Sequence, residues 1–235
     1  MAVKAELPPT SRVRWNSAHR IIPSRFPPID LFERVAPPGD WEALIELESL
    51  TNARLRDEVG EIHLVPQEER ISGPGASYVM ACFTHRNPTG SRFSDGSYGV
   101  YYAGKTFETA LRETVHHMGK FYAHTDMGPH NEDMRVLVGS IDTGLHDIRG
   151  QHRRWKQCLE PSSYQASQAL ARSLKELDSN GIVYPSVRHV GGECVGVFRP
   201  KCVKPPKQAS HLRYHWDGKQ MTRYFDYARS EWCSL

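Results

Sequence analysis

Residues 98–119 read YGVYYAGKTFETALRETVHHMG, and the periodicity of the apolar side chains changes once along this stretch. The run Tyr98–Tyr102 is rich in aromatic residues and predicts a strand. Thr106 is a good N-cap residue, and a helix is expected to run from there to Gly119. The apolar residues that recur at helical spacing are Phe107, Ala110, Leu111, Val115 and Met118. This stretch therefore predicts a strand followed closely by an amphipathic helix.

The sequence before this stretch predicts an extended arm, a helix and a buried strand. Residues 1–40 are rich in proline, which removes backbone donors, so this region is expected to be extended and loop-like. A helix is predicted between Asp40 as its N-cap and Gly60 as its stop. Residues 61–77 are expected to form a loop, and the short apolar run 78–83 predicts a buried strand.

The sequence after residue 119 predicts alternating strands and helices. The predicted elements are a strand at 134–141, an irregular segment at 142–161, a helix from Ser162 or Ser163 to about Ser179, strands at 181–184 and 195–198, and one or two edge strands within 212–227. Because these elements lack a regular strand–helix rhythm, we expect an α+β fold with a mixed or mostly antiparallel sheet and flanking helices. No glycine-rich dinucleotide fingerprint and no phosphate-binding loop of the Walker type is present.

The composition is that of an ordinary globular protein. The chain has 235 residues, of which 39% are hydrophobic, and a formal net charge of +3. Its five cysteines form no CxxC pair, and neither a signal peptide nor a membrane-spanning stretch is apparent. A cytoplasmic protein with no membrane association is the simplest expectation, because scattered cysteines suit a reducing compartment.

Polar side chains accompany glycine and aromatic residues at four places. Arg20 follows His19, and Arg92 lies in a glycine-flanked loop at 90–96. Tyr102 ends the predicted strand that precedes the helix bearing Glu113, and Ser186 follows a proline after the predicted strand 181–184. Each residue alone is more often a surface or packing residue than a catalytic one.

The order of these pieces resembles the RES domain, a family named for an arginine, a glutamate and a serine. The resemblance rests on four motifs: Gly90-x-Arg92-Phe93, Gly99-Val100-Tyr101-Tyr102-Ala103, Thr109-Ala110-Leu111-Arg112-Glu113 and Ile182-x-x-Pro185-Ser186-Val187-Arg188. It covers roughly residues 15–200. It implies a single RES-type domain over 1–235, with a proline-rich arm and helical insert at 1–77, similar to the longer ParT-like branch, and a C-terminal extension at 201–235.

The resemblance implies an ADP-ribosyltransferase-like fold and an enzyme that consumes NAD⁺. A carboxylate can stabilise the oxocarbenium-like state that forms when the nicotinamide–ribose bond breaks, and Glu113 is the candidate. Guanidinium groups suit a pyrophosphate, so Arg20 and Arg92 are candidate NAD⁺ ligands. Tyr102 could stack on nicotinamide, and Ser186 could bond a ribose hydroxyl or a phosphate. Ile21 stands where some family members have an aromatic residue, so no stacking is expected there.

The resemblance also implies a biological setting. Family members are toxins of bacterial toxin–antitoxin pairs, and the usual partner is an Xre-type antitoxin that occludes the active site. The sequence leaves the acceptor of ADP-ribose open among a protein side chain, phosphate and water, and the similarity to the longer branch favours a protein.

Two other classes of function have weaker support. A nucleic-acid-binding module would use a basic tail with interleaved aromatics, namely Lys201, Lys204, Lys207, Arg213, Lys219 and Arg223 with Tyr214, Trp216 and Tyr224. The small charge excess argues against it. A metal hydrolase would need ligand spacing that the 12 histidines lack, since His116 and His117 are adjacent and no HExxH occurs. We therefore expect neither a bound metal nor direct nucleic-acid binding.

Overall fold

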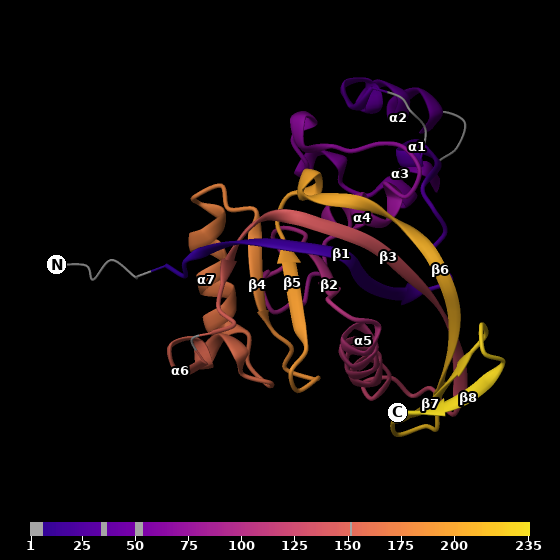
Figure 1. Ribbon diagram of the computed structural model, residues 1–235. Coiled ribbons are helices and arrows are strands. Elements are labelled where there is room, and N and C mark those ends of the chain that lie inside the picture. Colours follow the sequence, from indigo (N-terminus) through magenta and orange to yellow (C-terminus); the bar gives the residue numbers. More distant parts are fainter. Residues whose placement is uncertain (1–6, 34–36, 50–53, 151) are drawn as a thin grey trace.

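The computed structural model describes residues 7–33, 37–49, 54–150 and 152–235, which form a mixed sheet with helices on both sides (Figure 1). The strands are β1 Thr10–Pro23, β2 Tyr101–Gly104, β3 His130–Asp147, β4 Gly181–Pro185, β5 Glu193–Val197, β6 Val203–Trp216, β7 Met221–Asp226 and β8 Glu231–Ser234. Their order in the sheet is β1-β2-β5-β4-β3-β6-β7-β8. All pairings are antiparallel except that of β3 with β4. The predicted α+β class with a mixed, mostly antiparallel sheet is confirmed.

The long strand β3 is the centre of this sheet. It pairs with β1 from Thr10↔His146 to Pro23↔Met134, and on its other side with β6 from His130↔Trp216 onward. Because β1 also pairs with β2, the strands β1, β2, β5, β4 and β3 close a ring. Strands β6 to β8 then continue the sheet away from that ring.

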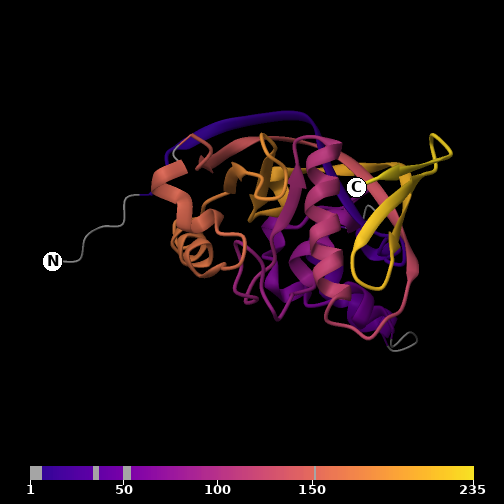
Figure 2. The same ribbon diagram turned by 90° about the horizontal axis from the view of Figure 1, so that it is seen from below.

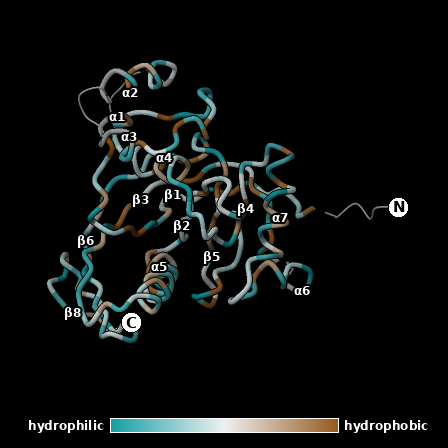
Figure 3. Tube along the Cα trace, turned by 180° about the vertical axis from the view of Figure 1, so that it is seen from behind, coloured by the Kyte–Doolittle hydropathy of each residue, from teal (hydrophilic) through white to brown (hydrophobic). Residues whose placement is uncertain are grey.

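The helices cover the sheet in three groups, each with its own apolar core. They are α1 Asp30–Glu33, α2 Trp41–Ser49, α3 Arg54–Val59, α4 Ser77–Thr84, α5 Phe107–Tyr122, α6 His152–Trp155 and α7 Gln165–Lys175. Short 3₁₀ turns occupy Pro38–Asp40, Ile62–Leu64, Gln67–Glu69, Lys156–Leu159 and Pro200–Cys202. Helices α1 to α4 pack on one core, and α6 and α7 pack on a second. Hydrophobic residues alternate with hydrophilic ones along the strands and along helices α5 and α7 (Figure 3).

Helix α5 packs on the third core, between the sheet and the C-terminal hairpin (Figure 2). Ala110 and Leu111 of α5 are buried there against Ile21 of β1 and Leu212 of β6. Leu212 and Tyr224 belong to the same core, so β6 and β7 both support the helix. The helix begins where it was predicted, with Thr106 as its N-cap, and continues through Gly119 to Tyr122.

The prediction of a buried strand at 78–83 is wrong, because these residues lie in helix α4. The amide of Met80 donates to the carbonyl of Ala76 over 2.8 Å, as in a helical turn. Val79, Met80 and Phe83 are buried while Ala81 and Cys82 are only partly so. A short apolar run does not distinguish a strand from a buried helix, and here the spacing of the buried residues follows a helix.

Three other predicted segments differ from the structure in their boundaries or in their regularity. The proline-rich arm contains β1, a paired strand in which Val13 and Trp15 are buried while Arg12 and Arg14 are exposed. Strand β3 continues through residue 147 into the segment that was expected to be irregular. The predicted helix at 40–60 appears as α2 and α3, and residues 50–53 between them lie outside the described residues.

The C-terminal tail forms strands β6, β7 and β8 where one or two edge strands were predicted. Tyr214 and Trp216 of β6 and Tyr224 of β7 are buried. These rings are therefore not available for stacking on nucleic-acid bases, which weakens the nucleic-acid alternative. No helix in the described part of the chain is long and apolar enough to cross a membrane.

Candidate functional site

Glu113 and Ser186 are joined by a short hydrogen bond although 73 positions separate them in the sequence. The Ser186 hydroxyl donates to Oε1 of Glu113 over 2.6 Å. The same hydroxyl accepts the backbone N–H of Arg188 over 3.2 Å and that of His189 over 2.9 Å. Both lone pairs and the proton of the hydroxyl are therefore used, so Ser186 holds the carboxylate in one position.

The turn that carries Ser186 is fastened to helix α5. The Ser186 amide donates to the carbonyl of Gly192 over 2.8 Å, which closes the turn between β4 and β5. Thr109 of α5 shares a hydrogen bond of 2.9 Å with Nδ1 of His189 in this turn. A Cβ at Gly192 would lie 2.7 Å from both the His189 ring and Oγ1 of Thr109, so only glycine allows this approach. The close contact aligns the helix with the turn and brings Glu113 to Ser186.

Tyr102 lies on β2 with its hydroxyl held by the loop that bears Arg92. The amide of Phe93 donates to this hydroxyl over 2.9 Å, and Oγ of Ser91 lies 2.8 Å from it. Burial raises the pKa of Tyr102 to about 12, so the phenol stays protonated at neutral pH. The half-buried ring lies over Gly196, where a Cβ would approach it to 3.3 Å. Tyr102 is thus a fixed ring rather than a mobile one.

Arg92 is buried, with 8% of the residue exposed. Its Nη1 donates to the carbonyl oxygens of Cys158 over 3.0 Å and of Glu160 over 3.1 Å, and its guanidinium lies 4.8 Å from the ring centre of Tyr164. Arg92 therefore ties its loop to the segment before α7. A buried guanidinium also supplies a fixed positive charge, which acts on the nearby phenol of Tyr102.

Arg20 contacts Tyr102 through the backbone only. Its Nη1 donates to the Tyr102 carbonyl over 2.9 Å, while its guanidinium lies 5.2 Å from the ring centre of Tyr101. Neighbouring side chains of a strand point to opposite faces, so this ring faces away from that of Tyr102. Nε of Arg20 is buried without a hydrogen-bond partner among the described residues. The guanidinium therefore has one N–H without a hydrogen-bond partner among the described residues, beside the Tyr101 ring.

The buried Tyr184 of β4 is affected electrostatically by residues of both hydrogen-bonded groups, the Glu113–Ser186 pair and Tyr102 with the Arg92 loop. Its pKa is raised well above the usual value, first by burial and then by nearby Cys194, Glu113 and Tyr102, while Arg92 acts in the opposite direction. Glu113, Tyr102 and Arg92 thus all act electrostatically on one buried phenol, and Ser186 joins this group through its hydrogen bond to Glu113. Arg20 joins this group only through the Tyr102 backbone.

His117 is a candidate site residue that the sequence interpretation missed. Its Nε2 lies 3.9 Å from Oε2 of Glu113, one helical turn earlier. The pKa of His117 is lowered, first by desolvation; Glu113 raises it and Arg188 lowers it. The spacing Glu113-x-x-x-His117 places both side chains on one face of a helix. This spacing was the available signal. Among the described residues no group of three or more His, Cys, Asp or Glu could hold a metal ion.

We expect the free energy of unfolding to fall as the pH drops from about 6.5 toward about 4. Desolvation and then Arg188 lower the pKa of His116 to about 4, from an ordinary value of 6.5. His19 and His117 also have lowered pKa values. Between these pH values the histidines take up protons in the unfolded chain but stay neutral in the folded protein. Their contribution to the free energy of unfolding is therefore fully present above about pH 6.5 and is lost as the pH falls toward about 4.

Urea denaturation at a series of pH values would measure this loss. His116→Gln, which cannot titrate, should flatten the dependence below pH 6.5 relative to the wild type. An identical pH dependence in the wild type and the His116→Gln variant would contradict the assignment.

Comparison with known proteins shows a family match and similarity to other proteins. The RES domain model matches residues 67–217, which is more than half of the chain. The uncharacterized protein y4oC of Sinorhizobium fredii (strain NBRC 101917 / NGR234) is 29% identical over 212 residues, covering 87% of this chain and 84% of that protein. Among solved structures, a chain of the M. tuberculosis MbcT–MbcA toxin–antitoxin complex aligns over 85% of both chains, with a TM-score of 0.44 and 9% identity. This last similarity is too low to carry a functional argument.

Proposed function

Because the chain belongs to the RES domain family, we propose that it is an NAD⁺-cleaving enzyme and the toxin of a bacterial toxin–antitoxin pair. The observation that carries the proposal is the 2.6 Å hydrogen bond from Ser186 to Glu113, which unites two residues of the sequence motif at one carboxylate. The side chain of Glu113 is 22% exposed, so the carboxylate is partly dehydrated and still open to a ligand.

The proposed reaction breaks the bond between nicotinamide and the ribose C1″. The bonding electrons leave with nicotinamide, and positive charge develops on the ribose ring. Glu113 stabilises this charge because a carboxylate in a partly dehydrated site interacts more strongly than one in water. Oxygen of an acceptor then bonds to C1″ and the acceptor loses a proton. His117, neutral at pH 7 because of its lowered pKa, is placed next to Glu113 to take that proton.

The remaining predicted residues would bind the substrate. Tyr102 would offer its fixed ring to nicotinamide. Arg20, whose Nε has no partner among the described residues, and Arg92 would supply positive charge to the pyrophosphate. The hydroxyl of Ser186 already donates to Glu113, so we propose that its main role is to position this carboxylate. Ser186 would bind a ribose hydroxyl only if its hydrogen bond to Glu113 were broken.

Replacing Arg92 with alanine is expected to raise the Kd for NAD⁺ by about 10- to 100-fold, the effect of losing a hydrogen bond to a charged group. Calorimetry in a Glu113→Gln background would measure it without consuming the substrate. Arg92 also donates hydrogen bonds to the carbonyls of Cys158 and Glu160, so the substitution could destabilise the fold. The thermal unfolding of the Arg92→Ala protein must therefore be measured in parallel. Arg172→Ala, which removes an exposed guanidinium paired with Asp95 of the same loop, is the matched variant and should leave the affinity unchanged. An unchanged affinity in a folded Arg92→Ala protein would remove Arg92 from the binding site.

We propose a protein side chain as the acceptor of ADP-ribose, with hydrolysis or phosphorolysis of NAD⁺ as the alternative. Incubation with labelled NAD⁺, with and without phosphate and with cell lysate, distinguishes the outcomes. Label on a protein band supports transfer. Free ADP-ribose or ADP-ribose-1″-phosphate as the sole labelled product overturns transfer and supports the alternative.

We propose that an Xre-type antitoxin is the partner and that it occludes the region around Glu113. A cytoplasmic location would fit both this partner and the five free cysteines of the structure. Co-expression with the product of the neighbouring gene should restore growth and block NAD⁺ loss. Undiminished NAD⁺ loss in the presence of the bound partner would contradict occlusion.

A further inference from the structure

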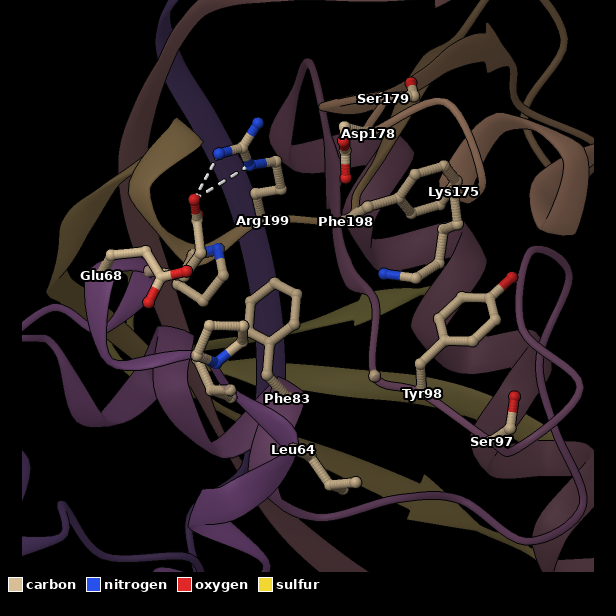
Figure 4. Close-up of a pocket in the computed structure, with 15 residues that line it drawn as sticks. Leu64, Glu68, Phe83, Ser97, Tyr98, Lys175, Asp178, Ser179, Phe198 and Arg199 are labelled. Carbon is tan, nitrogen blue, oxygen red and sulfur yellow. Dashed lines mark hydrogen bonds and ion pairs between the residues drawn. The ribbon is translucent and has the colours of Figure 1, made fainter.

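A pocket lies at the other end of strands β4 and β5 from Glu113. It has a volume of about 250 Å³, and its walls include Phe83, Tyr98, Lys175, Phe198 and Arg199 (Figure 4). Glu113 lies near Cys194 at the start of β5, whereas Phe198 directly follows its end. With a rise of roughly 3.3 Å per residue, four residues of strand separate the two places by roughly 13 Å. This pocket is therefore distinct from the place where Glu113 and Ser186 meet.

Lys175 extends from the end of α7 into this pocket (Figure 4). Its Nζ lies 4.7 Å from the ring centre of Tyr98 and 5.8 Å from that of Phe198. Among the described residues it forms no hydrogen bond or ion pair, and burial lowers its pKa. Asp178 and Glu69 of the same pocket attract this ammonium electrostatically, but neither forms an ion pair with it among the described residues. A half-buried ammonium held between two rings can therefore still bind an anionic group of a ligand directly.

Glu69 supplies a negatively charged group in the same pocket. Both Nε and Nη2 of Arg199 donate to Oε1 of Glu69, and Oε2 is buried without a hydrogen-bond partner among the described residues. The side chain is only 13% exposed. A buried carboxylate oxygen without a donor is unfavourable, so a ligand with an N–H donor would satisfy it.

The pocket also offers apolar surface but little room. Leu64, Pro66, Phe83 and Pro200 line it together with the two rings next to Lys175. Its volume lies below the roughly 300–1,000 Å³ of sites for drug-sized ligands, so the occupant must be small. The occupant therefore combines an anionic group, a cationic or N–H donor group and an apolar body.

We propose that this pocket binds a free amino acid with an apolar side chain. The carboxylate of the ligand pairs with Lys175, its ammonium group donates to Oε2 of Glu69, and its side chain packs against Phe83. Binding would be communicated toward the other site, because the Tyr98 hydroxyl donates to the Phe93 carbonyl over 2.9 Å and the Phe93 amide holds the Tyr102 hydroxyl.

L-phenylalanine is the probe, and calorimetry on the whole chain is the measurement. We expect saturable binding with a Kd of about 10 μM to 1 mM. L-phenylalaninamide lacks the carboxylate and 3-phenylpropionate lacks the ammonium group, so each should bind at least about 10-fold more weakly. Equal binding of all three compounds, or no binding of L-phenylalanine, overturns the proposal without the use of any variant.

Variants then locate the site. Lys175→Met should weaken L-phenylalanine binding by about 10- to 100-fold, whereas Lys204→Met, at an exposed position of β6, should not. Glu113→Gln should leave the binding unchanged, which keeps this proposal separate from the proposed NAD⁺ cleavage. Unweakened binding in Lys175→Met places the ligand elsewhere and overturns the assignment.

Discussion

Replacing Glu113 with glutamine is expected to lower the rate of NAD⁺ cleavage by about 10²- to 10³-fold, the usual effect of removing one group that stabilises transition-state charge. Glutamine has nearly the shape of glutamate, and its carbonyl oxygen can still accept the hydrogen bond from Ser186. The negative charge that faces the ribose is lost. Chromatographic measurement of NAD⁺ and nicotinamide over time gives the rate.

The control for this variant lies on the same helix. Glu108 is exposed and pairs with Arg112 at a spacing of four residues, so Glu108→Gln removes a carboxylate of α5 that is remote from Ser186. Its activity should equal that of the wild type, and circular dichroism should show that both variants are folded. Full activity in Glu113→Gln would refute the role of this carboxylate and with it the proposed mechanism.

Replacing Gly99 with alanine is expected to lower the free energy of unfolding by about 3 kcal/mol, the upper part of the usual range for overpacking. A Cβ at this position would lie 1.9 Å from the carbonyl oxygen of Cys82 and 2.5 Å from Cα of Phe83. Both are backbone atoms at the end of α4, which cannot rotate away. Thermal unfolding should show a fall in Tm of roughly 6–12 °C for a chain of this length.

Gly128→Ala is the matched variant, because an added Cβ there meets nothing within 4 Å. It should unfold at the temperature of the wild type. A Tm for Gly99→Ala that equals this control would mean that α4 does not approach Gly99 as closely as the structure has it. Because Gly99 leads into β2, the Gly99→Ala variant should also show weaker NAD⁺ cleavage through displacement of Tyr102.

The sequence predicted best the elements that local signals define. The helix after Thr106 has a cap, an apolar stripe and a strand before it, and the strands 181–184 and 195–198 are short apolar runs beside glycine. Residues 78–83 lacked such signals, since six apolar residues fit either a strand or a buried helix. The pairing of β1 with β3 depends on residues about 130 positions apart, such as Arg12 and Asp142, and no local sequence pattern predicts this pairing.

The candidate site was predictable in part for a similar reason. The order of the motifs suggested Glu113 and Ser186, and the structure joins them directly. The burial of Arg92 and its two bonds to backbone carbonyls depend on the segment at 158–160, which sequence patterns could not bring next to residue 92. His117 could have been found, because its spacing from Glu113 is a helical one.

The position of β3 between two distant strands has a consequence for synthesis on the ribosome. Its partners come from opposite ends of the chain, β1 before it and β6 well after it. Contacts so distant in sequence form slowly, since the intervening loop must close first. Helix α5 rests on a core that includes Leu212 and Tyr224, so part of its support emerges from the ribosome long after the helix does. Nascent chains would therefore complete the region around Glu113 only after residues 212–224 have left the ribosome, well after the helix itself has been made.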